Sequence, residues 1–147
     1  MTNALGKLFA TDKDAEKNGI DVEVGTVLRD GKEVPMLFTV RRSGGNNLEY
    51  KRTIERLTKP HRRAIEKGKM DLVKLQEITQ ECFLESVLVG WENIPFGEGK
   101  DQKFRQFNVA NARILFDLYP ELLVELQDNA QEIANFQNSR LEEEAKN

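Results

Sequence analysis

The sequence predicts an α+β fold, mainly α, in which an N-terminal β-hairpin is followed by a compact bundle of about five helices. Apolar residues alternate with polar ones before position 42, and they recur at helical spacing after position 47. The glycine-rich segment Ser43–Asn46 separates the two patterns. A length of 147 residues corresponds to one ordinary domain, which we place at residues 1–139, with residues 140–147 as a flexible acidic tail.

The hairpin is expected at about residues 20–42. Val22 to Leu28 forms the first strand, and Asp30-Gly31 is a turn signal because glycine tolerates a positive φ. The return strand runs from Val34 to Arg42, with Pro35 at an edge position near its start. The side chains expected to face the core are those of Met36, Phe38 and Val40.

The helical part is expected at about residues 46–139, where proline, glycine and capping residues separate the helices. The first helix ends near Thr58-Lys59, because Pro60 disfavours α geometry in the residue before it. A second, short helix follows and has Gly68 at its C-terminal cap.

A third helix is expected from Asp71, its N-cap, to about Val89, followed by a loop from Trp91 to Lys103. Asn108 caps a fourth helix and Pro120 opens a fifth. In the third helix the residues expected to face the core are Leu72, Leu75, Ile78, Cys82, Phe83, Val87 and Val89. In the last two they are Val109, Ala112, Leu115, Phe116, Leu122, Leu126, Ala130, Ile133 and Phe136.

Residue composition argues against most kinds of active site. The chain has one cysteine, Cys82, and one histidine, His61, which excludes an internal disulfide and a Cys- or His-rich metal site. Cys82 lies on an apolar helix stripe, as expected of a buried, inert thiol, and no nucleophile or orienting acid accompanies His61. Trp91 is interpreted as a core residue that fixes the following loop. We therefore expect no enzymatic activity, no catalytic residue, no cofactor and no metal.

Apolar runs are short throughout the sequence. None approaches the roughly 20 residues of a transmembrane helix, and the N-terminus lacks a stretch of signal-peptide length. We therefore expect a cytoplasmic protein without a membrane partner.

The net charge of −3 conceals an asymmetry. Residues 41–69 contain ten Lys/Arg and three Glu, a local charge of +7, whereas residues 117–147 have a local charge of −6. The basic segment has three open interpretations: a solvated helix face, a nucleic-acid surface, or a surface attracted to acidic protein, such as the C-terminal helix of a second copy. Tyr50 is its only aromatic residue and the whole chain is acidic, which weakens the nucleic-acid interpretation.

Six arginines of this segment are the candidate partner-binding residues. They are Arg41, Arg42, Arg52, Arg56, Arg62 and Arg63. Contact between the basic segment and the acidic last helix predicts weak, salt-sensitive self-association into a homo-oligomer.

Six short blocks occur in a characteristic order across about residues 36–147. They are Phe38–Asn46 (FTVRRSGGN), Pro60–Ile65 (PHRRAI) with Gly68 and Asp71 after it, Val89–Glu92 (VGWE), Phe107 with Asn111 and Ala112, Leu118–Leu122 (LYPEL) and Glu142–Asn147 (EEEAKN). In this order they resemble the tail assembly chaperones of long-tailed, siphovirus-type bacteriophages. The first 35 residues match that family less well, and the loop 95–104 departs from its pattern.

The resemblance implies a non-enzymatic protein that binds the phage tape-measure protein, keeps it soluble and helps to recruit tail tube subunits through a frameshifted longer product. It also implies a location in the cytoplasm of the bacterial host and absence from the mature virion. Residues 145–147, Ala-Lys-Asn, can be encoded by a sequence on which ribosomes slip, as a programmed frameshift requires. The alternative is a small DNA-binding regulatory protein that uses residues 41–69.

Overall fold

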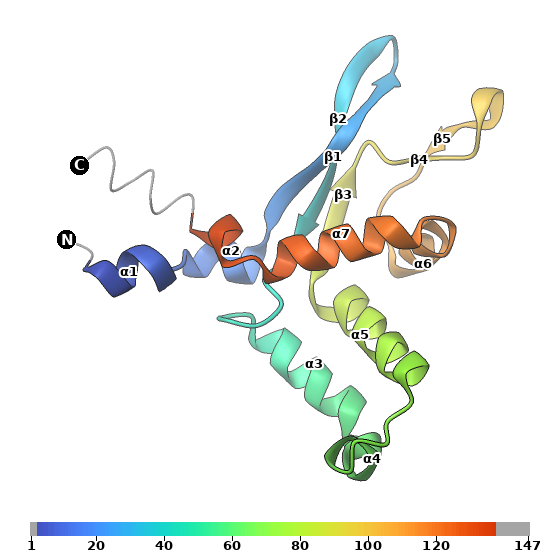
Figure 1. Ribbon diagram of the computed structural model, residues 1–147. Helices are drawn as coiled ribbons and strands as arrows, with labels where there is room; N and C mark the ends of the chain where they lie inside the picture. The colour runs from blue at the N-terminus through green and yellow to red at the C-terminus, as the bar shows by residue number, and fades with distance from the viewer. Residues whose placement is uncertain (1–2, 138–147) are drawn as a thin grey trace.

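The computed structural model in Figure 1 describes residues 3–137. Two short helices that the sequence did not predict, α1 (Ala4–Phe9) and α2 (Lys13–Asn18), precede the hairpin. Each begins at a capping side chain, Asn3 or Asp12, that accepts hydrogen bonds from the first-turn N–H groups. With six residues each, they are too short to produce a periodic apolar pattern.

The hairpin consists of β1 (Ile20–Arg29) and β2 (Lys32–Val40), which confirms the prediction for residues 20–42. Asp30 and Gly31 both have positive φ at its turn. Phe38 and Val40 are buried as predicted, and Met36 packs against the core.

A third strand, β3 (Leu88–Glu92), corrects the prediction that the third helix continues to Val89. It pairs antiparallel with β2, so that Phe38 lies opposite both Val22 and Trp91. The apolar pattern of this segment fits the end of a helix as well as a strand. The segment forms a strand because β2 offers an edge with which it can pair. Val89 is therefore a half-buried strand residue.

Four helical segments form an arm, residues 48–86, that projects from the body of the protein (Figure 1). They are α3 (Leu48–Thr58), the 3₁₀ turn η1 (Lys59–His61), α4 (Arg62–Glu66) and α5 (Leu72–Ser86). α3 and α5 pack side by side, and α4 lies at the far end. The predicted cap Asp71 is confirmed at the start of α5, and Asn47 caps the start of α3.

The start of α5 differs from the sequence prediction. Leu72 and Leu75 were expected in the core, but their exposed fractions are 79% and 39%. The first turns of α5 lie at the outer end of the arm, where the body no longer covers them (Figure 1). The α5 stripe enters the core only from Ile78 onward, through Cys82 and Phe83.

The chain returns across the body through α6 (Val109–Leu118), α7 (Pro120–Gln131) and the 3₁₀ turn η3 (Ile133–Phe136). Asn108 caps α6 and Pro120 opens α7, as predicted, although Val109 is exposed rather than inward. The expected loop 91–103 contains the end of β3 and a small hairpin. Its elements are β4 (Pro95–Phe96), the 3₁₀ turn η2 (Gly99–Asp101) and β5 (Lys103–Phe104).

Trp91 lies in the main core, which confirms its predicted structural role. Its ring packs edge-on against Phe38 and Phe107, with centroid distances of 5.9 and 5.1 Å. Its indole N–H donates a 2.8 Å hydrogen bond to the carbonyl oxygen of Arg105, which fixes the segment after β5 to the core.

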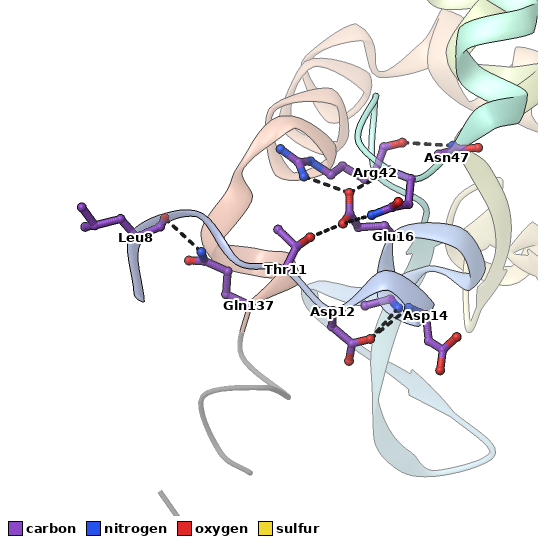
Figure 2. Close-up of polar contacts among 10 residues, drawn as sticks. Leu8, Thr11, Asp12, Asp14, Glu16, Arg42, Asn47 and Gln137 are labelled. Atoms are coloured by element: carbon purple, nitrogen blue, oxygen red, sulfur yellow. Dashed lines mark hydrogen bonds and ion pairs between the residues drawn. The ribbon is translucent and has the colours of Figure 1, made fainter. Parts of the chain in front are cut away.

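Both ends of the described chain meet beside α2. The Asp12 N–H donates to the Phe136 carbonyl (2.7 Å), and the Gln137 side-chain amide donates to the Leu8 carbonyl (3.0 Å; Figure 2). The predicted fold class is confirmed: within residues 3–137, the hairpin is followed by five α-helices, α3 to α7, in an α+β fold that is mainly α. The predicted tail, residues 140–147, lies outside the described residues.

Candidate partner-binding surfaces

Arg42 is held inside the fold by a buried carboxylate. Its Nη1 donates to Oε2 of Glu16 at 2.8 Å, and Glu16 has no exposed surface (Figure 2). Asn46 donates to the same carboxylate from its backbone N–H (3.1 Å) and its side-chain amide (2.9 Å), and the Thr11 hydroxyl donates as well. Burial acts to raise the pKa of Glu16, but the hydrogen bonds from Thr11, Asn46 and Arg42 outweigh it and lower the pKa to about 2.

Two further candidate arginines are Arg56, on α3 of the arm, and Arg41, in the segment that precedes the arm. Arg56 forms an ion pair of 2.5 Å with Glu85, which joins α3 to α5 on the surface. Arg41 lies half-buried at the base of the arm, where its backbone N–H donates to Val87 at 2.8 Å. Its Nε is buried without an acceptor among the residues that the structure describes.

The arm tip, residues 59–69, carries Arg62 and Arg63. Both are exposed, together with Lys59, Lys67 and Lys69. Five cations and Glu66 give the tip a net charge of +4. Between residues 3 and 137, no ion pair joins any of these cations to an acid.

The structure therefore spreads the six candidate arginines from the segment before the arm to the arm tip, instead of gathering them at one site. Arg42 stabilises the fold through Glu16, and Arg56 is paired with Glu85 on the surface. Arg41 is half-buried, and Arg52 is exposed on α3. Only Arg62 and Arg63 are neighbours within a dense group of exposed cations.

A groove of about 480 Å³ lies between α5, α6 and α7. Its floor consists of buried apolar side chains, those of Leu84, Phe116 and Leu123. Its charged rim consists of Glu77, Glu81, Asp117 and Arg113. Three acids and one base give this rim a net charge of −2, so the groove is an acidic surface distinct from the arm tip.

Arg113 and Glu81 hold the two sides of the groove together. The two terminal guanidinium nitrogens of Arg113 on α6, Nη1 and Nη2, donate to the Glu81 carboxylate on α5, each at 2.7 Å. These hydrogen bonds lower the pKa of Glu81 and outweigh its partial burial. This groove could not be predicted from the sequence, because residues 77–81, 113–117 and 120–123 come together only after α5, α6 and α7 have packed.

An apolar strip is exposed where α6 meets α7. Ile114 and Leu118 are four residues apart and share the solvent face of α6, and Tyr119 follows at the joint. The exposed fractions of Leu118 and Tyr119 are 61% and 56%. Large apolar side chains grouped in this way are typical of a protein-binding surface.

Cys82 lies apart from these surfaces, whereas His61 belongs to the arm tip. Cys82 is buried, as predicted, and burial raises the pKa of its thiol. His61 lies half-buried in η1. Among residues 3–137, no group of three His, Cys, Asp or Glu side chains could hold a metal ion, and no helix in that range is long and apolar enough to cross a membrane.

Comparison with known protein families gives a match over most of the chain. The model of a family described as "YdaY prophage protein" matches residues 45–147, which include the arm, the groove and the apolar strip. No curated protein and no solved structure matches the chain.

Proposed function

Because the chain belongs to the YdaY prophage protein family and is thus phage-derived, we propose that it is a non-enzymatic tail assembly chaperone. In this proposal it binds the tape-measure protein of its phage and keeps that protein soluble. It also helps to recruit tail tube subunits, with a frameshifted longer product as the link. It acts in the cytoplasm of the bacterial host and is absent from the mature virion.

The apolar strip is the observation that carries this proposal. Ile114, Leu118 and Tyr119 leave apolar area in water that a client helix would bury. Two residues of the strip, Leu118 and Tyr119, lie within the joint Leu118–Leu122, one of the blocks that resemble the chaperone family. A long helix with a repeating apolar stripe offers many equivalent places for such a surface, so many copies could cover one client.

The arm tip favours a second candidate, a small DNA-binding regulator. Five exposed cations could neutralise several phosphates, which would give a binding strength that falls steeply with salt. Base recognition would need side chains that reach a groove of the duplex, and the tip presents mainly Lys and Arg.

Co-expression with the tape-measure protein of the same prophage tests the proposal. We expect the wild-type chain to raise the soluble fraction of the tape-measure protein, and Leu118→Glu with Tyr119→Glu to abolish this effect. Leu28→Glu is the matched control, because Leu28 is 67% exposed on the hairpin, away from the strip. It should retain full rescue.

Two results would count against the chaperone proposal. One is a wild-type chain that does not solubilise the tape-measure protein. The other is equal rescue by the strip variant and the Leu28 control. A sequence-specific DNA shift at physiological salt, without rescue, would favour the regulator.

A further inference from the structure

We propose that the arm tip of one copy docks into the α5–α6–α7 groove of a second copy, so that the protein associates head to tail. The inference concerns the chain by itself and does not depend on the tape-measure proposal. The two surfaces belong to different helices and are both exposed in the same molecule.

Charge complementarity identifies the occupant of the groove. The tip has a net charge of +4 and the rim of the groove has a net charge of −2. Glu77 and Asp117 are exposed on that rim, whereas Glu81 is already occupied by Arg113. Glu77 lies 3.6 Å from Lys74, in a surface pair of little strength. Two acids of the groove are therefore available to the cations of a second copy.

The apolar parts of the two surfaces also correspond. Ile65 is exposed on α4, within one helical turn of Arg62. The floor of the groove is apolar, so Ile65 could cover it while the neighbouring arginines face the acidic rim. The floor side chains are largely covered by one another, so the apolar gain is small and the contact depends mainly on charge.

A copy cannot place its tip in its own groove. α4 joins the start of α5 through residues 67–71, and the Asp71 side chain accepts from the Val73 N–H to begin α5. Folding the tip back along α5 would break this cap and separate η1 from the end of α3, against which it packs. We therefore place the contact between molecules. It joins two different patches, so it extends into open chains when the tip of each copy binds a different neighbour.

The acidic surface in this proposal is the groove, whereas the acidic surface expected from the sequence was the last helix. The sequence analysis paired the basic segment with the last helix, within residues 117–147. Three of the acids in that range, Glu142, Glu143 and Glu144, lie outside the described residues. Asp117 belongs both to the acidic segment 117–147 and to the groove. Glu77 comes from α5, and only the folded chain brings it to the same groove as Asp117.

Sedimentation velocity on the full chain, with two charge-reversed variants, tests the contact. The tip variant carries Arg62→Glu and Arg63→Glu, and the groove variant carries Glu77→Lys and Asp117→Lys. We expect the wild type to grow beyond dimers as its concentration rises at low salt, and to dissociate at high salt. Each variant alone should associate at least about tenfold more weakly, because the reversal places like charges opposite one another.

Mixing the two variants is the decisive measurement. The groove variant keeps an intact tip and the tip variant keeps an intact groove, and the two reversed surfaces again carry opposite charges at the substituted positions. An equimolar mixture should therefore associate at a concentration at which neither variant associates alone. Two controls reverse the same number of charges elsewhere: Lys13→Glu with Lys100→Glu, and Glu142→Lys with Glu143→Lys. Both controls should associate as the wild type does. Circular dichroism and thermal unfolding confirm that every variant is folded.

Several results would overturn the proposal. They are a wild type that stays monomeric at low salt and high concentration, a wild type that stops at dimers, a mixture that stays monomeric, and loss of association in the Glu142 and Glu143 control. These results are independent of the tape-measure proposal, because that proposal is tested with substitutions in the apolar strip.

Discussion

Glu16 and Arg42 form an ion pair of 2.8 Å that fastens α2 to the segment between β2 and α3. The carboxylate is completely buried, whereas the Arg42 side chain is 21% exposed. A buried carboxylate is costly unless its oxygens are fully hydrogen-bonded, and here Thr11, Arg42 and Asn46 all donate to it. The pair is therefore a structural element of the fold and is not available to a partner.

Replacing Glu16 with glutamine should destabilise the protein. The amide keeps the shape of the side chain but loses the charge, and its NH₂ group would face the donors of Arg42 and Asn46. We expect the free energy of unfolding at neutral pH to fall by about 3 kcal/mol, as measured by urea denaturation. Glu33→Gln, at an exposed hairpin position, is the control and should leave it almost unchanged.

The same group predicts how stability depends on pH. The folded-state pKa of Glu16 is about 2, below the ordinary value of 4.5, so the unfolded chain takes up the proton first as pH falls. Its contribution is fully present above pH 4.5 and is lost as pH falls toward 2. The stability gap between the wild type and Glu16→Gln should therefore narrow between about pH 5 and pH 2 in parallel denaturation series. A constant gap across this range would contradict the assignment.

Gly45 should resist substitution because of the same carboxylate. Its φ is +53°, and an added Cβ would overlap the Glu16 carboxylate and approach Arg42 Nη1 to 2.8 Å. Gly68 is a matched control, with a φ of +65° and open space around its missing Cβ. We expect Gly68→Ala to lower the free energy of unfolding by about 1 kcal/mol, because alanine is strained at a positive φ. Gly45→Ala should lower it by a further 1–3 kcal/mol or so, because the added Cβ also meets the Glu16 carboxylate. Equal losses in thermal unfolding would show that the Glu16 carboxylate can move aside.

Asn47 and Asn108 offer a second matched comparison, because both cap helices. Asn108 is exposed and its side chain accepts only from the Asn111 N–H, so Asn108→Ala should cost about 1 kcal/mol. Asn47 is buried, and besides capping α3 its amide donates to the carbonyls of Arg42 (3.0 Å) and Ser86 (2.9 Å). Leaving these carbonyls unsatisfied should raise the cost of Asn47→Ala to roughly 2–4 kcal/mol in chemical denaturation.

Trp91 provides a fluorescence signal for the integrity of the core, because it is the only tryptophan in the chain. Phe107 packs edge-on against it at 5.1 Å, so Phe107→Ala should admit water and shift the emission to longer wavelength. The same variant should lose about 3 kcal/mol of stability through the cavity it creates. Phe9→Ala should change neither quantity, because Phe9 is exposed on α1.

Much of the fold could be predicted from local signals in the sequence. Asp30-Gly31 marked the hairpin turn, and Asp71, Asn108 and Pro120 each marked a helix start that the structure confirms. These signals act over a few residues, through backbone conformation and side-chain caps. For that reason they can be read without knowledge of the tertiary structure.

Features that depend on contacts between distant segments could not be predicted. Leu88–Glu92 becomes a strand because β2 offers it an edge, and Leu72 is exposed because the arm extends beyond the body. The burial of Glu16 could not be predicted from the sequence, because Glu16 lies in the mostly polar segment Thr11–Asn18. The groove likewise depends on three helices meeting. Its acids appeared in the sequence only as ordinary surface charges.

The hydrogen bond between the Gln137 side chain and the Leu8 carbonyl has a consequence for the order of events during synthesis. The two residues are 129 positions apart, so this contact can form only after Gln137 has left the ribosome. Arg42 and Asn46, which donate hydrogen bonds to Glu16, leave the ribosome much earlier than Gln137 does. The helix α2 can therefore attach to the end of the hairpin on a nascent chain, before η3 has been synthesised. Attachment of α2 to the body thus has an early step and a late step, and only the late step requires nearly complete translation of the described chain.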